Sequence, residues 1–217
     1  MKKGKLIVID GMDGSGKKTQ ADLLIKRLKK EKKKAVLVDF PNYGDFFGKI
    51  SRRYLDGEFG DINPYPASLI FAADRWKSKE KIEDYLKKGF FVISNRYVNS
   101  NLAYQSARIK NVPARPAFIK WDRKMEYEIF GIPKPDLVFY LDIPISITDQ
   151  LISKRKQKNE FYRQNLEFLK QVHENYRKLS KEKDWVVIEC LDSQKLLSKA
   201  EIAEKIWLVV VKRIVQV

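Results

Sequence analysis

A glycine-rich stretch near the start of the chain has the residue types and the order of a phosphate-binding P-loop. It runs from Gly11 to Thr19, reads GMDGSGKKT, follows the apolar run Leu6–Ile9 and precedes the amphipathic segment 21–30. In a strand, glycine loop and helix of this order, backbone N–H groups surround an anion at the helix N-terminus. The loop lysine, here Lys17, reaches the terminal phosphates of a nucleotide. The stretch therefore predicts a nucleotide phosphate site.

The length and composition fit one soluble domain over residues 1–217 that binds anions. Hydrophobic residues make up 44% of the chain and charged residues 33%, which suits a globular protein with one large core. Lys and Arg outnumber Asp and Glu by 44 to 28, and the net charge of +16 favours anionic partners. A lysine-rich solvated surface also explains this excess. The sequence has no motif that reads a nucleic-acid groove, so we expect no nucleic-acid partner.

The cysteine count and the lengths of the apolar runs indicate a cytoplasmic protein. Cys190 alone excludes an intramolecular disulfide, and it follows the apolar run 186–188, so we expect it in the core. The first apolar run is too short for a signal peptide, and the run 206–211 is too short to span a bilayer. We therefore predict a cytoplasmic location and no membrane partner.

Five apolar runs alternate with helical patterns along the chain. Their continuous apolarity indicates burial on both faces, which is typical of a parallel sheet covered by helices. The alternation predicts an α/β P-loop fold, a three-layer sandwich in which a five-stranded parallel sheet has helices on both faces. The expected strands are 6–9, 35–40, 90–94, 137–141 and 185–189. The expected helices are 16–30, 46–56, 66–88, 100–109, 115–130, 145–157, 160–182 and 199–214.

Polar and aromatic residues follow the first three predicted strands. The glycine loop follows the first strand, Phe40 to Tyr43 follow the second, and Asn95 to Tyr97 follow the third. Ligands of an open parallel sheet bind at the carboxyl ends of its strands. We therefore expect these three segments to form one site.

In their order and spacing, these motifs resemble the thymidylate kinases, which are nucleoside monophosphate kinases. The resemblance covers most of the chain, and deoxynucleoside kinases are the nearest alternative. It implies transfer of a phosphoryl group from ATP to dTMP, which gives dTDP and ADP, and it implies a homodimer. The matching segments are Gly11 to Lys17 with Thr19-Gln20, Phe40-Pro41, Phe71 to Trp76, Asn95 to Gln105, and Ile132 to Asp136.

The resemblance implies an ATP site in the glycine loop. Lys17 and the loop amides would hold the ATP phosphates, and Thr19 would contact the α-phosphate. The implied ATP-binding residues are Gly11, Asp13, Gly14, Ser15, Gly16, Lys17, Lys18 and Thr19.

The resemblance also implies a site for the acceptor nucleotide. Asp13 would accept a hydrogen bond from its 3′-hydroxyl, Phe71 would stack on thymine, and Arg75 would bind the edge of the base. Arg96 would bind the acceptor phosphate, and Tyr104 would pack near the sugar and help to exclude a 2′-hydroxyl. The implied substrate-binding residues are Asp13, Phe40, Phe71, Arg75, Arg96, Tyr104 and Gln105.

The residue types alone leave plainer roles open. Phe71 alone would be a core residue, but Arg75 lies one helical turn later on the same face, and a buried arginine needs a polar partner. Asp13 could be a turn residue and Arg96 a surface ion-pair partner, although Arg96 directly follows a buried strand. The only histidine, His173, is expected at an exposed helix position rather than in a Ser/His/Asp group.

Phosphoryl transfer to a nucleoside monophosphate needs no general base, because the acceptor is already an anion. The reaction depends on positioning and on neutralising charge. Some thymidylate kinases carry an arginine in the loop at the position of Gly14, and others supply it from a lid. The basic segment 154–163 fits the second type, with Arg155 as the expected arginine and Arg163 as the alternative, although a solvated linker explains it equally well. The predicted catalytic residues are Lys17, Arg96 and Arg155.

Three positions depart from the family pattern, and two of them concern the metal. Lys18 replaces the hydroxyl ligand of Mg²⁺, and Asn95 replaces the aspartate that usually begins an Asp-Arg-Tyr motif. Asn42 lies where many relatives carry an arginine near the acceptor phosphate. We hypothesise that the Lys18 ammonium group occupies part of the Mg²⁺ volume, that Asn95 avoids a buried ion pair there, and that metal dependence is weakened or altered. The alternative is that Lys18 points to solvent, with Mg²⁺ held through water by ATP and Asp13.

These departures keep two other functions open. Together, Lys18 and Asn95 suit a nucleotide-binding homologue with weak or lost kinase activity. The second alternative is a kinase for another deoxynucleotide or for a deoxynucleoside. Mg²⁺ is the expected cofactor, and the metal ligands stay unassigned.

Overall fold

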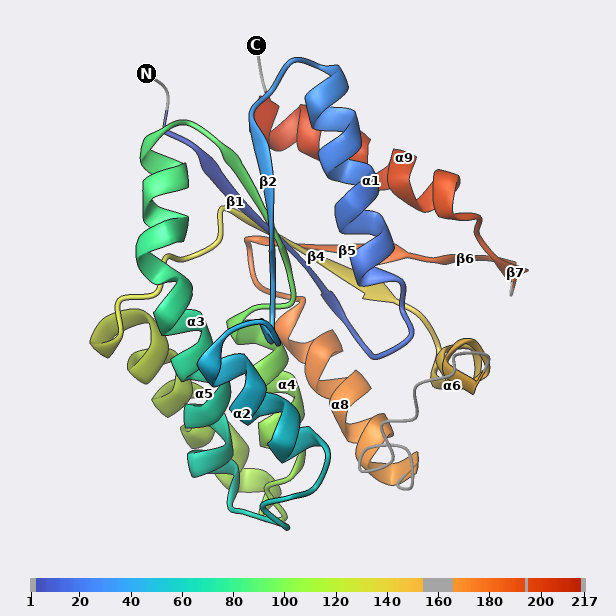
Figure 1. The fold of residues 1–217 in the computed structure, drawn as a ribbon. Helices are drawn as coiled ribbons and strands as arrows, with labels where there is room; N and C mark the ends of the chain where they lie inside the picture. The colour runs from blue at the N-terminus through green and yellow to red at the C-terminus, as the bar shows by residue number, and fades with distance from the viewer. Residues whose placement is uncertain (1–2, 154–165, 194, 216–217) are drawn as a thin grey trace.

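A five-stranded parallel sheet forms the centre of the computed structural model, which describes residues 3–153, 166–193 and 195–215. The strands lie in the order β2-β3-β1-β4-β5, and helices cover both faces (Figure 1). The predicted α/β sandwich is confirmed, and every predicted strand is present. The strands are β1 (Lys5–Gly11), β2 (Ala35–Asp39), β3 (Phe91–Asn95), β4 (Leu137–Asp142) and β5 (Trp185–Glu189).

The helices agree with the predicted segments except at some of their ends. Within the described residues, no helix is long and apolar enough to cross a membrane. The helices are α1 (Lys17–Lys30), α2 (Phe46–Leu55), α3 (Pro64–Lys87), α4 (Val98–Ala107), α5 (Arg115–Arg123), α6 (Ile145–Ser153), α8 (Leu166–Leu179) and α9 (Lys199–Val210).

Two of the predicted helices end in π-helical segments, which an apolar period alone does not reveal. α5 continues as η2 (Lys124–Ile129), and α9 continues as η3 (Val211–Val215). The predicted helices 145–157 and 160–182 lie partly outside the described residues. Smaller elements that were not predicted are the 3₁₀ turn η1 (Val112–Ala114) and the hairpin strands β6 (Leu191–Asp192) and β7 (Lys195–Leu196).

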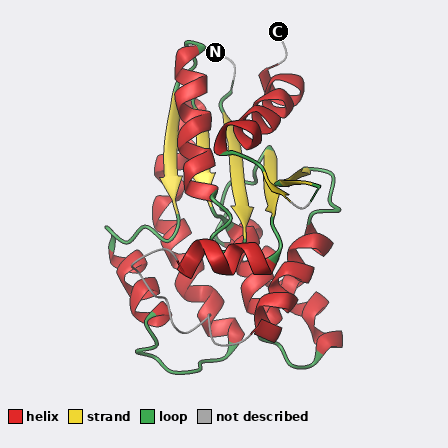
Figure 2. Ribbon diagram, turned by 90° about the vertical axis from the view of Figure 1, so that its right-hand side faces the viewer, coloured by secondary structure: helices red, strands yellow, loops and turns green. Residues whose placement is uncertain are grey.

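Side chains of β1 alternate between two hydrophobic clusters, one on each face of the sheet. Leu6 and Val8 pack in the cluster that includes side chains of α3, α4 and α8. Ile7 and Ile9 pack in the cluster that includes α1 and α9. Figure 1 shows α3 on one side of the strands and α1 and α9 on the other, and Figure 2 shows the same fold turned by 90°. The continuous apolar run is therefore explained by burial on both faces.

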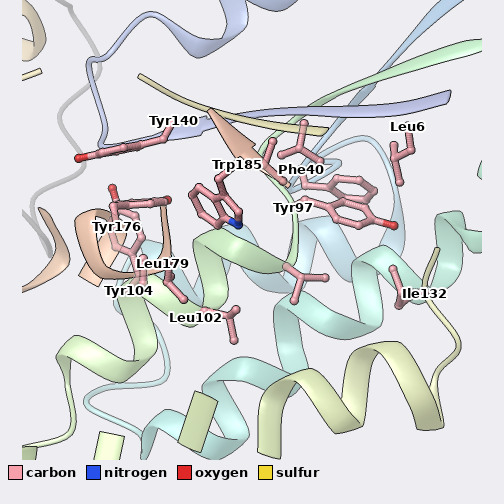
Figure 3. Packing of buried hydrophobic residues seen from close by; sticks show 14 of the residues in the cluster. Leu6, Phe40, Tyr97, Leu102, Tyr104, Ile132, Tyr140, Tyr176, Leu179 and Trp185 are labelled. Atoms are coloured by element: carbon pink, nitrogen blue, oxygen red, sulfur yellow. The ribbon is translucent and has the colours of Figure 1, made fainter. Parts of the chain in front are cut away.

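Aromatic side chains fix two helices against the carboxyl end of β4. The rings of Tyr140 in β4 and Tyr176 in α8 stack with their centroids 5.2 Å apart (Figure 3). Tyr104 in α4 meets Tyr176 edge-on at a centroid distance of 6.2 Å. Such ring geometries are favourable beyond the apolar area that they bury. They hold α4 and α8 beside the ends of the central strands.

The prediction that Cys190 is a core residue is confirmed. Its side chain is fully buried, and its thiol donates a hydrogen bond to the Ile188 carbonyl oxygen at 3.3 Å. Burial raises the pKa of the thiol to about 12, so it stays protonated.

Candidate functional site

The glycine loop leads directly into the N-terminus of α1. Gly14 and Gly16 have φ angles of 84° and 83°, a left-handed conformation that glycine adopts without steric cost. Gly16 is the N-cap residue, it offers no side-chain cap, and the first turn of α1 contains no acidic residue. The first amides of a helix lack intrahelical acceptors and lie at the positive end of its dipole. This end of α1 therefore suits an anion such as a phosphate.

Lys17 places a positive charge within the loop. Its side chain is buried, and the ammonium group donates a hydrogen bond to the Met12 carbonyl oxygen at 2.7 Å. The Ser15 hydroxyl is also buried, and it has no hydrogen-bond partner among the described residues. The loop thus combines a cation with a polar group that is available to a ligand.

An ion pair between Asp13 and Arg96 connects the loop to the end of β3. The Tyr104 hydroxyl donates to Asp13 Oδ2 at 3.2 Å, and it accepts from the Asp13 backbone N–H at 3.1 Å. The Arg96 guanidinium group lies over the Tyr104 ring, 5.4 Å from its centroid. Arg96 also has a φ of 64°, which is rare for a residue with a side chain and occurs often at functional sites. Its placement is therefore tightly defined.

The pair stays ionised. Partial loss of solvation raises the pKa of Asp13, but the positive charges of Arg96 and Lys17 outweigh this effect and hold the pKa below its ordinary value. Burial lowers the pKa of Arg96, but Asp13 outweighs it and the net shift is well upward. The loop and the end of β3 thus share a fixed carboxylate and a fixed guanidinium.

Asp10 is a site residue that sequence reasoning missed. It is fully buried at the end of β1. Its Oδ1 accepts hydrogen bonds from the Gly11 N–H at 2.8 Å, the Ser100 hydroxyl at 2.7 Å and the Tyr176 hydroxyl at 2.7 Å. Ser100 in turn accepts from Arg96 Nη1 at 3.0 Å. The sequence does contain a feature that could have identified Asp10. It is an acidic residue directly between an apolar strand and a glycine loop.

A cavity of about 670 Å³, counting the space open to solvent at its mouth, lies beside this ion pair. The structure brings all of the predicted substrate-binding residues to its lining, although they come from four separate segments. They are Asp13, Phe40, Phe71, Arg75, Arg96, Tyr104 and Gln105.

Among the lining residues that were not predicted are two buried polar side chains, whose burial depends on tertiary packing. Asp74 accepts a hydrogen bond from the Asn42 N–H at 2.8 Å, and burial raises its pKa. Asn101 is buried, and its Oδ1 has no partner among the described residues. The Asn42 side chain is neutral and brings no charge to the site. Its Oδ1 accepts a hydrogen bond from the Gly44 N–H at 3.3 Å.

The hypothesis that the Lys18 ammonium group occupies part of the Mg²⁺ volume stays a prediction. Lys18 is exposed, and its ammonium group lies 2.9 Å from Asp22, one turn later on α1. Asn95, at the position where relatives carry an aspartate, has another carboxylate beside it. Its Nδ2 donates to Asp39 Oδ1 at 2.6 Å, from the position directly opposite on β2. A carboxylate therefore lies one strand away from its usual position.

The expectation that His173 is exposed is wrong. Its Nε2 lies 2.8 Å from Asp142 Oδ1, and the side chain is only 19% exposed, because α8 packs against the end of β4. The segment 154–163, with Arg155 and Arg163, lies outside the described residues.

A parallel sheet of this order, a glycine loop after its central strand and a cavity at the strand ends define a P-loop kinase of the nucleoside monophosphate class. Comparison with known families makes the assignment specific. The family model for thymidylate kinase matches residues 9–202, and the chain belongs to this family.

Individual relatives agree with this assignment. The chain is 32% identical over 188 residues to a thymidylate kinase from Plasmodium falciparum, which covers 87% of this chain and 83% of the relative. It is 40% identical over 182 residues to a probable thymidylate kinase from Thermococcus onnurineus, covering 80% and 83%. The structure of a thymidylate kinase from Candida albicans aligns with a TM-score of 0.76 at 26% identity, over 97% of this chain and 92% of the other.

Replacement of Asp13 by asparagine tests the ion pair through its pH dependence. Because the pKa of Asp13 is lowered in the folded state, its ionised form stabilises the fold above about pH 4. This stabilisation is lost as the pH falls through the lowered folded-state pKa. Asp13 is half exposed, so we expect Asp13→Asn to lower the free energy of unfolding by about 1 kcal/mol at neutral pH.

The measurement is urea denaturation of both proteins from neutral pH down to pH 3. We expect the difference between them to narrow below about pH 4. Asp22→Asn controls for the loss of one carboxylate near the loop. A difference that stays constant over the whole range would contradict the assignment.

Proposed function

We propose that this chain transfers the terminal phosphoryl group of ATP to dTMP, which gives dTDP and ADP. The observation that carries the proposal is the cavity that runs from the Asp13–Arg96 ion pair to Phe71 and Arg75, directly beside the glycine loop. The charged pair at one end suits the phosphate of an acceptor nucleotide, and the aromatic ring and the guanidinium group at the other end suit its base.

We assign the ATP phosphates to the glycine loop and the N-terminus of α1. The loop amides and the Lys17 ammonium group would contact them, since both lie at the positive end of the helix. Thr19, in the first turn of α1, would contact the α-phosphate. The charge of Lys17 would offset the negative charge on the transferring oxygens.

We assign the acceptor phosphate to Arg96, whose guanidinium group is held by Asp13 and Ser100. Phe71 would stack on the base, and Tyr104 would lie against the sugar. The acceptor needs no deprotonation, so the contribution of these residues is positioning in line with the ATP phosphates. Arg155 remains the predicted lid arginine, with Arg163 as the alternative.

A magnesium ion would accompany ATP, and the residues at this edge of the sheet fit it. Mg²⁺ prefers carboxylate, carbonyl and water oxygens. The Asp39 carboxylate lies beside Asn95, whose Oδ1 is buried without a partner among the described residues. The Lys18 ammonium group is paired with Asp22, and its positive charge also acts on the Asp39 carboxyl group. When bound, the ion would neutralise phosphate charge, and Asp39 would hold its water ligands in place of an aspartate at position 95.

The non-catalytic alternative rests on Lys18 and Asn95 together. In the structure Lys18 is paired with Asp22 and Asn95 lies beside the Asp39 carboxylate, and neither contact favours that alternative.

We further propose a cytoplasmic homodimer. Leu69 and Trp76 lie seven residues apart on α3, and their side chains are 43% and 51% exposed. Two such apolar side chains on one face of a helix suit contact with a second copy. Sedimentation at micromolar protein concentration measures the oligomeric state directly, and a monomeric protein would contradict the proposed dimer.

Phe71→Ala tests the assignment of the base. Stacking of a base on an aromatic ring contributes about 1–3 kcal/mol, so we expect dTMP affinity to fall about tenfold or more. ATP affinity stays the same, because the glycine loop is unchanged. Calorimetric titration measures both, and Phe46→Ala, which removes a phenylalanine that is 66% exposed, is the control. Equal losses for dTMP and ATP would contradict stacking at this position.

Asp39→Ala tests the metal assignment by ATP binding with and without Mg²⁺. Loss of a residue that orients metal ligands typically costs 10–100-fold in metal affinity. We therefore expect the Mg²⁺-dependent gain in ATP affinity to fall about tenfold. Asp22→Ala should leave the gain unchanged, and the double variant Asp39→Ala/Asn95→Asp should restore it. A gain that is unaffected in Asp39→Ala would refute this assignment.

A further inference from the structure

A buried ion pair stands beside the cavity, between α3 and the π-helical segment η2. Arg75 donates two hydrogen bonds to Glu126, from Nε to Oε2 and from Nη2 to Oε1, both at 2.5 Å. The side chains are 4% and 0% exposed. A buried ion pair contributes little net stability, because desolvation offsets the attraction. The fixed, two-point geometry is better explained if Glu126 serves to position Arg75.

The ion pair with Glu126 determines which N–H donors of Arg75 stay available to a ligand. A guanidinium group carries five N–H bonds, and Glu126 occupies those of Nε and one of Nη2. Nη1 makes no hydrogen bond to the part of the chain that the structure describes, and Arg75 lines the cavity. Glu126 thereby turns Arg75 into a donor for a ligand.

The same carboxylate determines the orientation of Asn101. The Asn101 Nδ2 group donates to Glu126 Oε1 at 3.3 Å, to Asp122 Oδ1 at 3.1 Å and to the Ser68 carbonyl oxygen at 3.2 Å. A flipped amide would place its oxygen against these three acceptors. Its Oδ1 must therefore point away from them, and it is buried without a partner among the described residues. An unpaired buried oxygen is costly, so a ligand N–H is its expected partner.

Asp122 and Glu126 form one acidic unit. They lie four residues apart where α5 runs into η2, so they share a face. Burial, and then the charge of Glu126, raise the pKa of Asp122 well above its ordinary value. The Ile132 N–H donates to the Glu126 carbonyl oxygen at 2.9 Å, which anchors the segment. Local π-helical turns of this kind are frequent at functional sites.

We propose that Glu126, supported by Asp122, is the positioning residue for base selection in the acceptor nucleotide. It holds a donor on Arg75 beside an acceptor on Asn101. This pattern selects a base whose carbonyl group is adjacent to a ring N–H, as in thymine and uracil. Cytosine would place an amino group and an unprotonated ring nitrogen there, so donor would face donor. The inference rests on the proposed function, because it concerns the acceptor base.

Equilibrium binding of dUMP and dCMP tests this proposal, since their bases differ only at this edge. We expect wild-type protein to bind dUMP at least about tenfold more tightly than dCMP. Glu126→Gln presents an amide donor to Arg75 or Asn101, so we expect this ratio to fall towards one with ATP affinity unchanged. Glu126→Asp should restore part of the ratio. Glu128→Gln, at an exposed position of the same segment, should keep it.

The outcomes separate this inference from the proposed function. Wild-type protein that binds neither dTMP nor dUMP would overturn both. Wild-type protein that prefers dUMP, with an unchanged ratio in folded Glu126→Gln, would overturn the inference alone. If Glu126→Gln does not fold, Asp122→Ala carries the test, because it removes an acceptor of Asn101. An unchanged ratio in that variant would also overturn the proposal.

Discussion

The site depends on the buried carboxylate of Asp10 at the end of the central strand. Burial of a carboxylate is costly unless it accepts hydrogen bonds. Here one oxygen accepts hydrogen bonds from the glycine loop, from Ser100 of α4 and from Tyr176 of α8. Three elements that are far apart in the sequence are thus held at one point. Because Ser100 also contacts Arg96, the same carboxylate sets the distance between the loop and the cation at the end of β3.

From this point the charges divide the site into two ends. At the loop end, Lys17 and Arg96 are held by Met12 and Asp13, which suits phosphates on both sides of the transferring group. At the other end, buried acids hold Arg75 and Asn101 in place, and these two side chains are the proposed contacts to the base. The protein needs no general base for this reaction and uses charged groups to position its substrates.

The sequence predicts those parts of this arrangement that depend on local pattern. The strands follow from apolar runs buried on both faces, and the site follows from polar residues at three strand ends. Other parts depend on distant contacts and could not be predicted. Glu126 acquires its role only because η2 packs beside α3, and Asp39 only because the register places it opposite Asn95. The ion pair between Lys18 and Asp22 could have been predicted from the sequence, since Asp22 lies one helical turn after Lys18.

Our central claim is that ATP and a thymidine nucleotide meet at the ends of β1 and β3, where a phosphoryl group passes from ATP to the nucleotide. ADP release from ATP, with dTMP, dGMP or UMP as the acceptor and with or without Mg²⁺, tests it most directly. We predict Mg²⁺-dependent release that is fastest with dTMP. Absence of ADP release with every acceptor, from protein that still binds ATP, would contradict the claim.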